Sequence, residues 1–525
     1  MATFPEKINW NLSHLFSSDT DPLQGIEQKE RASASEAFAQ KWEKRTDWLL
    51  EPTVLRQALD DYEQWEKTGG SSGKSGYYIG LRQAQEEDNP NLKALANKVE
   101  NEARLNWNKV QFFTHRLAKV PQNIQEKFLQ SPELEPYKHF LELLFAEAKY
   151  LLSEPEEKIL LAKGGVAFGK WVELTSSFLS REERTVDGSQ KTVAELVSLS
   201  SHSNKKTRDE AAQGLNDVLK AISPLAEAEI NAILEDKRIN DELRGIERPD
   251  LGRHLADDVQ SEMVDGLLSS VEAKNDIARR FYTLKAKLLG VPKLLYHERS
   301  VPYGRLSDDY TFEKSVALVK ETFEELDSEF AEIFNLFLAE GRFDVFPQKG
   351  KSDGAFCASG ALTHPTYILL NHTNRLQDVL ALAHETGHGI NNEFMRRSCH
   401  ALSFGSPLST AEVASTFVED FVLEKLAQKA TDEERLAIYM MKLNDDVSTI
   451  FRQVACYRFE QALHLHFREK GYLSKEEIGA LFRTAMQTYM GESCLIFWLA
   501  TVYSRSSQYL CGRLCFRKIS PKSYR

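Results

Sequence analysis

The chain has 525 residues, a formal net charge of −12 and six cysteines, and 42% of its residues are hydrophobic. This length exceeds what a single hydrophobic core usually supports, so we expect two or more domains. The acidic balance argues against nucleic acid as a partner, because phosphate binding needs a basic surface. No stretch has the roughly 18 uncharged apolar residues that a membrane span needs, so we expect no membrane partner either.

The cysteines are scattered and form no C-x-x-C pair. The N-terminal sequence MATFPEKINWNLSHLF lacks the basic block and apolar run of a secretory signal. A chain of this length does not need disulfides for stability. We therefore expect a cytoplasmic protein. The sequence gives no indication of its oligomeric state.

Most of the sequence predicts helices, because apolar residues recur at spacings of three and four. The fold class is therefore mainly α. Long windows of this kind near residues 92–116 and 208–240 favour an elongated helical bundle. A softer break in the pattern near residues 180–195 separates an expected N-terminal helical domain, 1–195, from a second domain, 196–525.

One segment favours β-structure. In KGKSDGAFCASGALTHPTYILLNHTN, at residues 349–374, Gly, Ser and Pro separate short runs of β-forming residues. We interpret Gly354–Ser359 and Thr366–Asn371 as strands joined by a loop. They predict a small β-sheet immediately before the helix that follows.

That helix carries the motif with the clearest chemistry. The sequence NHTNRLQDVLALAHETGH predicts a helix that begins near Asn374, with Gln377 completing a capping box. His384 and His388 are four residues apart, so their imidazoles lie on one face of the helix. Two imidazoles in this arrangement can converge on one metal ion.

Glu385 follows His384 and is rotated from it by about 100° around the helix. It would therefore lie beside a metal rather than bind it, where it could take a proton from a metal-bound water. Gly387 has no side chain, so a substrate backbone could come close to the helix at this position. The alternative is a helical scaffold in which the H-E-x-x-H pattern arose by chance, since the motif alone is a moderate signal.

A catalytic zinc needs a third protein ligand. The sequence PLSTAEVASTFVEDF predicts a second helix, capped by Ser409 or Thr410, with Glu412 in its first turn. Glu412 is far enough from His388 for the chain to reverse and bring the two helices together. An acidic residue in a first turn can also serve only the helix dipole. Glu419, two turns further on the same face, either orients a ligating histidine or is solvated.

The predicted strand Thr366–Asn371 stands next to this helix. A free sheet edge can hold an extended peptide through main-chain hydrogen bonds, so we expect this strand to bind substrate. Tyr367 and Leu369 in the strand are candidate substrate contacts. His372, just after it, is a third candidate, although a local polar role would explain it equally well.

These motifs together resemble the oligoendopeptidase F branch of the thimet oligopeptidase family of zinc metallopeptidases. The likeness extends in the same order over most of residues 8–480. It is carried by HETGH and STAEVASTFVED, and by INWNLSHLF, YLLSEPEEKIL, FDVFPQKGKSDGAFCAS, YILLNHTNRLQDVLALAHETGHG and ALHLHFREKGYLSKEEI.

The resemblance implies an α-helical shell around a deep channel with one zinc ion at its floor, and cleavage of short, unfolded peptides. It implies that His384, His388 and Glu412 are the zinc ligands and that Glu385 is the general base. The second domain, 196–525, would be the zinc peptidase catalytic domain. The function expected is hydrolysis of oligopeptides by a zinc-bound water that Glu385 activates.

The tail at residues 491–525 departs from the family. The resemblance implies a His- and Tyr-rich segment there that polarises the scissile carbonyl, but the tail contains no histidine, and Tyr503 and Tyr509 are the remaining candidates. A truncated or frameshifted end would explain the difference. The alternative function is therefore a zinc- and peptide-binding homologue with weak or no activity. Asn391, where the family often has a histidine, is not a ligand position.

Overall fold

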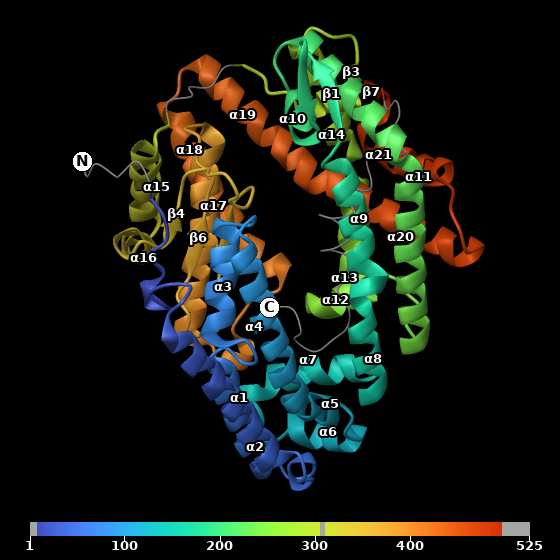
Figure 1. The fold of residues 1–525 in the computed structure, drawn as a ribbon. Coiled ribbons are helices and arrows are strands. Elements are labelled where there is room, and N and C mark those ends of the chain that lie inside the picture. The colour runs from blue at the N-terminus through green and yellow to red at the C-terminus, as the bar shows by residue number, and fades with distance from the viewer. Residues whose placement is uncertain (1–7, 305–309, 496–525) are drawn as a thin grey trace. The chain divides into compact units, whose positions relative to one another are not determined.

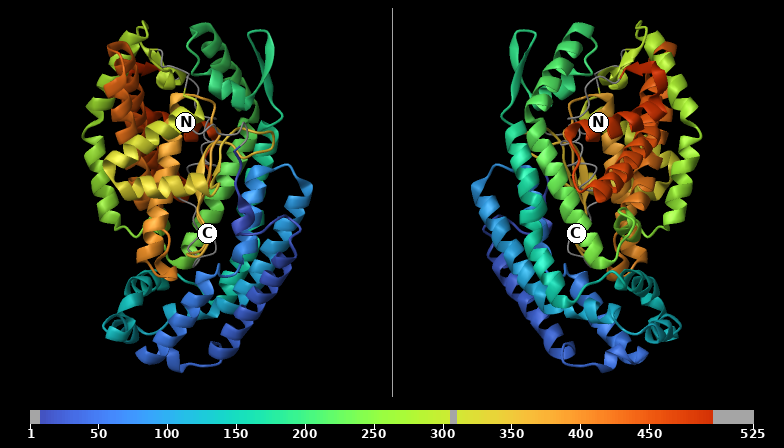
Figure 2. Two further views of the ribbon diagram at one scale, coloured as in Figure 1. Left: turned by 90° about the vertical axis from the view of Figure 1, so that its left-hand side faces the viewer. Right: turned by 90° about the vertical axis from the view of Figure 1, so that its right-hand side faces the viewer.

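The computed structural model describes residues 8–304 and 310–495 (Figure 1). Helices predominate in every view (Figures 1 and 2), and the strands form three small sheets among the described residues. The predicted mainly α class is confirmed. Contacts divide the described chain into two compact units, each built from two separate segments.

The first unit comprises the described residues up to Ala148 and those from residue 310 to Lys429. The second comprises Lys149 to residue 304 and Ala430 to residue 495. The boundary expected at residue 195 lies inside the second unit. The division into an N-terminal and a catalytic domain, and the channel implied by the resemblance, stay predictions.

Proline opens three helices of the first unit, at Pro22, Pro52 and Pro90, where a helix has no acceptor for a backbone N–H. Asp21 and Asn89 cap two of them by accepting hydrogen bonds from first-turn N–H groups. The α-helices of this unit are α1 (Pro22–Trp42), α2 (Pro52–Lys67), α3 (Gly73–Gln85), α4 (Pro90–Val110), α5 (Phe112–Ala118), α6 (Gln122–Leu129), α7 (Lys138–Ala148), α15 (Phe312–Leu326), α16 (Ser328–Ala339), α17 (Leu376–Ser398) and α18 (Leu408–Lys429).

The second unit is organised around α11 (Lys205–Arg244), which begins after the cap Asn204 and ends at Gly245 in the left-handed region. Its apolar residues, with those of α14, α20 and α21, form the unit's main core. The other α-helices are α8 (Glu154–Gly164), α9 (Lys170–Leu179), α10 (Val193–Leu199), α12 (Leu251–Ala256), α13 (Ser261–Glu272), α14 (Asn275–Leu288), α19 (Asp432–Val447), α20 (Gln453–Lys470) and α21 (Lys475–Met490).

This unit also contains two small sheets. The strands β1 (Glu183–Val186) and β2 (Ser189–Thr192) form an antiparallel hairpin, and β3 (Leu294–Leu295) pairs in parallel with β7 (Cys494–Leu495). The hairpin turns at Asp187 and Gly188, both with positive φ. An Asp-Gly pair is a strong signal for such a turn. The hairpin coincides with the break in the helical pattern near residues 180–195, where a domain boundary was expected.

The sheet of the first unit has the order β4 (Phe343–Asp344), β6 (Tyr367–Leu369), β5 (Phe356–Ala358). Both predicted strands are present but shorter than expected. The expectation that Thr366–Asn371 forms the free edge is wrong, because β4 pairs in parallel with β6 on the side opposite β5. The three residues of β6 are fully buried, and β5 is the edge strand next to the metal-motif helix.

The register of the sheet decides which backbone groups of β5 point away from β6. The N–H of Ile368 in β6 donates to the Arg342 carbonyl on the β4 side. Cys357 lies opposite Ile368 in the antiparallel pair. Hydrogen-bonded and non-bonded pairs alternate in such a ladder, so the N–H and C=O of Cys357 point away from β6.

Candidate metal centre

The helix α17 carries the H-E-x-x-H motif and begins at Leu376. The predicted capping pair, Asn374 with Gln377, is not the one used. Instead, the carboxylate of Asp378 accepts hydrogen bonds from the N–H groups of Thr373 at 2.7 Å and Arg375 at 2.9 Å. Asn374 itself has a φ of 67°, a conformation that asparagine tolerates.

The helices α17 and α18 lie side by side (Figure 1) and are in extensive contact. Gly387 lies at a close contact between them. A Cβ added there would lie 2.8 Å from both the backbone oxygen of Ala414 and the Cα of Ser415. Gly387 therefore faces α18, and not an open substrate surface as the sequence suggested.

This packing brings together the three predicted metal ligands. The Oε2 atom of Glu412 lies 3.3 Å from Nε2 of His384 and 3.7 Å from Nε2 of His388. One donor atom from each of the three residues lies within 4.8 Å of the other two. Because α18 begins at Leu408, Glu412 is beyond its first turn, which removes the helix-dipole alternative.

Further groups contact each of these three residues. The Nδ1 atom of His384 lies 3.1 Å from a carboxylate oxygen of Glu419, so Glu419 takes the orienting position rather than the solvated one. His388 hydrogen-bonds to the backbone carbonyl of Ala411. The hydroxyl of Ser415 donates to Oε2 of Glu412 at 3.0 Å. Partners of this kind on the second ring nitrogen can fix the tautomer of a ligating imidazole.

Glu385 lies next to this group, with only 8% of its surface exposed. Burial raises the pKa of its carboxyl to about 7, assisted by the charge of Glu412 and opposed by that of His384. The backbone N–H of Cys357 on β5 donates to the same carboxylate. The edge strand and Glu385 are thus in direct contact, a link that the sequence pattern did not indicate.

The electrostatics of the site favour a cation. Burial by itself would lower the pKa of His384, but the carboxylates of Glu412, Glu419 and Glu385 raise it to about 10. The pKa of Glu412 is lowered, chiefly by its hydrogen bond to His384. A field strong enough to hold a proton on His384 at neutral pH also attracts a divalent ion. Two imidazoles and one carboxylate are donors that such an ion accepts.

The predicted substrate residues lie elsewhere. The side chains of Tyr367 and Leu369 are fully buried, and the Tyr367 hydroxyl donates to the Asn11 carbonyl at 2.9 Å. His372 is 3% exposed, and its Nε2 atom lies 3.0 Å from the Ser315 hydroxyl. The structure does not bring these side chains into the group of ligands. Tyr503, with Tyr509 and most of the atypical tail, lies outside the described residues.

A second group of ligand types occurs in the second unit, where Asp209, His297 and Glu298 also have donor atoms within 4.8 Å. Two cations already occupy this group. Lys205 lies 2.8 Å from Asp209 and 3.3 Å from Glu298, and Arg208 donates to Glu298 at 2.7 Å. The carboxylates are therefore neutralised without a metal.

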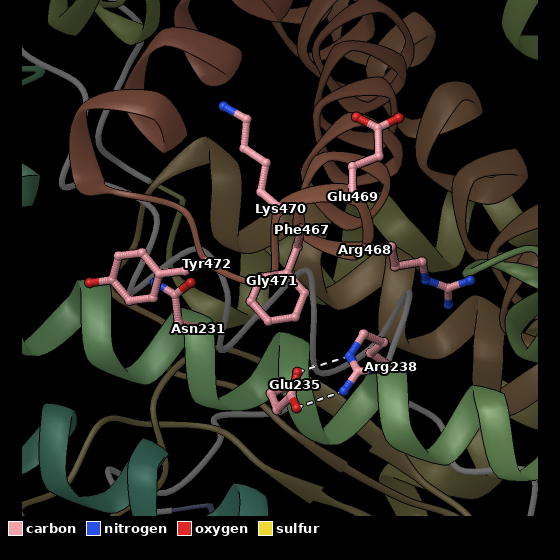
Figure 3. A pocket seen from close by; sticks show the side chains of 9 residues that line it. All are labelled: Asn231, Glu235, Arg238, Phe467, Arg468, Glu469, Lys470, Gly471 and Tyr472. Atoms are coloured by element: carbon pink, nitrogen blue, oxygen red, sulfur yellow. Dashed lines mark hydrogen bonds and ion pairs between the residues drawn. The ribbon is translucent and has the colours of Figure 1, made fainter.

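The second unit also has a surface cavity of about 550 Å³ (Figure 3). Arg238 pairs with Glu235 at 2.7 Å, and Lys470 pairs with Glu477 at 2.5 Å. No arrangement of catalytic type is present among its side chains. The lining residues are Asn231, Glu235, Arg238, Phe467, Arg468, Glu469, Lys470, Gly471 and Tyr472.

Comparison with known proteins gives consistent matches. Residues 189–508 match the family described as Peptidase family M3, and residues 116–181 match the one described as Oligopeptidase F. The chain is 24% identical over 388 residues to the group B oligopeptidase PepB of Streptococcus agalactiae, a match that covers 72% of this chain and 64% of PepB. It is 23% identical over 502 residues to an oligoendopeptidase F homolog of Borreliella burgdorferi, covering 93% of this chain and 82% of that protein.

The fold has solved counterparts as well. The crystal structure of oligoendopeptidase F from Enterococcus faecium superposes with a TM-score of 0.63 at 16% identity, covering 91% of this chain and 81% of that one. The chain thus spans less than two thirds of the length of PepB and more of the other two proteins. No helix among residues 8–304 and 310–495 is both long and apolar enough to cross a bilayer.

Proposed function

Because the chain belongs to peptidase family M3, as its motifs predicted, we propose that it is a zinc-dependent endopeptidase that hydrolyses short, unfolded peptides. The observation that carries the proposal is the convergence of His384, His388 and Glu412, with the carboxylate of Glu385 beside them. The names of the relatives, oligopeptidase and oligoendopeptidase, support a short peptide as substrate.

The donor set supports one zinc ion per chain. Two histidines and one glutamate are a known ligand set of catalytic zinc, which leaves a coordination position open for chemistry. When bound, zinc supplies Lewis acidity, which lowers the pKa of a water and polarises a carbonyl oxygen. Glu419 and the Ala411 carbonyl would hold the two imidazoles in the tautomer that ligation needs.

Glu385 supplies the proton transfers. Its pKa of about 7 suits a group that accepts and then releases a proton near neutral pH. Its carboxylate takes the proton of the attacking water as the C–O bond forms at the peptide carbonyl. It then passes this proton to the leaving nitrogen as the C–N bond breaks, so that a carboxylic acid and an amine leave as products.

The edge strand β5 is the proposed site for the substrate backbone. Because the outward N–H of Cys357 already donates to Glu385, its outward C=O is the group left to accept a main-chain hydrogen bond from an added strand. Because the same N–H contacts Glu385, a peptide bound there would lie with its backbone next to the general base.

A second candidate is a zinc- and peptide-binding homologue with little or no hydrolysis. It is favoured by residues 491–525, which contain no histidine to serve as an oxyanion donor. Loss of such a donor typically reduces turnover by about 100-fold or more. For either function we propose a cytoplasmic location, supported by the free thiols of Cys357, Cys399 and Cys456, and no nucleic-acid or membrane partner.

The test combines metal analysis with cleavage of a quenched fluorescent peptide. We expect about one zinc per chain, loss of cleavage with a chelator and recovery with added zinc. Glu385→Gln should retain zinc and lose on the order of 100-fold or more in turnover. Glu424→Gln, at an exposed position on α18, should behave as wild type.

Three outcomes separate the alternatives. Cleavage that survives metal removal contradicts a zinc mechanism, and normal turnover in Glu385→Gln removes this residue from the reaction. Zinc and peptide binding by the wild type without turnover would favour the second candidate function.

A further inference from the structure

Ser415 is a fully buried serine on α18, one turn after Glu412. Its hydroxyl lies 3.0 Å from Oε2 of Glu412 and 3.1 Å from the backbone carbonyl of the same residue. No part of the proposed reaction accounts for this hydroxyl.

Packing explains why position 415 is small, but not why it is a serine. Ser415 is fully buried where the two helices are in contact, so a larger side chain there would have to displace its neighbours. Alanine would satisfy the same packing. A buried hydroxyl costs stability unless it is hydrogen-bonded. The reason for a serine at this position should therefore be the group that accepts its hydrogen bond.

The acceptor is the third metal ligand. Of the two carboxylate oxygens of Glu412, Oε2 is the one that lies 3.3 Å from His384 and 3.7 Å from His388. The same oxygen receives the Ser415 hydroxyl. A glutamate with 43% of its side chain exposed could otherwise rotate toward solvent.

We propose that Ser415 is the positioning residue for Glu412: its hydroxyl keeps Oε2 directed at the two imidazole nitrogens and so prepares the third ligand before metal binds. This inference rests on the proposed function, because it concerns the affinity of the same metal centre. The other reading is an ordinary bond from the hydroxyl to a backbone carbonyl within the helix, with no bearing on the ligand.

The neighbouring residue provides a matched control. The hydroxyl of Thr416 donates to the backbone carbonyl of Glu412 at 2.7 Å, but not to its carboxylate, and the residue is exposed. Removing it deletes a hydroxyl bonded to the same residue and leaves the carboxylate untouched.

The experiment uses the full chain, depleted of metal, and measures its dissociation constant for zinc by chelator competition. We expect Ser415→Ala to bind zinc about 10–100-fold more weakly, and Thr416→Ala to bind it about as tightly as wild type. Ser415→Cys, which retains the volume and a weak donor, should fall between wild type and Ser415→Ala. The visible absorption of bound Co²⁺, which reports ligand geometry, should change in Ser415→Ala alone of the two alanine variants.

A zinc affinity of Ser415→Ala within about twofold of wild type, with an unchanged Co²⁺ spectrum, overturns the positioning role. Equal weakening by Ser415→Ala and Thr416→Ala also overturns it, in favour of the backbone bond. Melting of the metal-free proteins separates misfolding from a local effect, and if Ser415→Ala fails to fold, Ser415→Cys decides. A wild type that binds no zinc contradicts the proposed function itself and is thereby distinguishable.

Discussion

The Oε2 atom of Glu412 lies 3.3 Å from Nε2 of His384, although the two residues belong to different helices. The contact exists because Gly387 lets α18 approach the backbone of α17. Several measurable consequences follow from this packing and from the groups around it.

Removing the carboxylate of Glu412 should abolish tight metal binding. We expect Glu412→Ala to lose at least about 100-fold in zinc affinity, because two imidazoles alone leave the donor set incomplete. Glu424→Ala on the same helix should bind zinc as wild type does. Metal analysis after dialysis measures both, and a zinc content in Glu412→Ala equal to that of wild type would show that Glu412 is not a ligand.

Glu419 should have a smaller effect than Glu412, because its carboxylate contacts Nδ1 of His384 rather than the ligating nitrogen. We expect Glu419→Gln to weaken zinc binding by about 10–100-fold, since the amide orients the imidazole without a negative charge. Chelator competition provides the dissociation constant. A value unchanged from wild type would mean that the 3.1 Å contact has no influence on the metal.

Gly387→Ala should destabilise the protein by about 1–3 kcal/mol, because its methyl group would overlap the backbone of Ala414 and Ser415. It should also weaken zinc binding by moving Glu412. The control is Gly266→Ala on α13, where a Cβ meets nothing within 4 Å and helix propensity favours alanine. Chemical unfolding should separate the two variants, and equal stabilities would contradict the close helix contact.

The outward N–H of Cys357 can be tested by removing it. Proline is tolerated in an edge strand where the N–H does not join the ladder, so Cys357→Pro should fold. It should lower kcat for peptide cleavage, because the hydrogen bond from this N–H to the Glu385 carboxylate disappears. Cys357→Ala retains the N–H and should remain active. Similar kinetics in the two variants would show that this N–H has no influence on Glu385.

Glu229 on α11 provides a prediction for stability against pH. Its side chain is fully buried, and burial raises the pKa of its carboxyl from 4.5 to about 7. The folded state therefore holds this proton more tightly than the unfolded state. The resulting stability is complete below pH 4.5 and is lost as the pH rises toward 7. Above pH 7 the buried carboxylate should cost about 3 kcal/mol.

Glu229→Gln should therefore be more stable than wild type at pH 8 and similar to it at pH 4.5. Melting temperatures at the two values measure this, and Glu262→Gln, at an exposed position on α13, is the control. A difference from wild type that is the same at both pH values would show that the ionisation of Glu229 is not responsible.

The sequence predicted those parts of the structure that depend on local spacing. The helix that carries His384 and His388 and the long helix near residues 208–240 were expected from periodicity. The two strands were expected from the Gly, Ser and Pro that separate runs of β-forming residues. The reversal of the chain between two helices made Glu412 a candidate third ligand, and the family resemblance implied that role.

The predictions that were wrong concern contacts between segments that are distant in the sequence. The strand β4 has two residues and leaves no recognisable pattern, yet its pairing makes β6 central and moves the free edge to β5. Gly387 faces α18, and the sequence of α17 alone does not indicate which helix packs against this position. The hairpin at Asp187 and Gly188 is different, because its Asp-Gly turn signal is local and is present in the sequence itself.

The position of the donors on two adjoining helices has a thermodynamic consequence. A cation shared by His384, His388 and Glu412 would act as a cross-link between α17 and α18, closing the loop at residues 399–407 that joins them. The free energy of metal binding would then add to the folding stability of this pair of helices. Loss of the ion to a chelator would therefore loosen the helix packing that holds Glu385. A protein short of metal should accordingly be inactivated at a lower temperature.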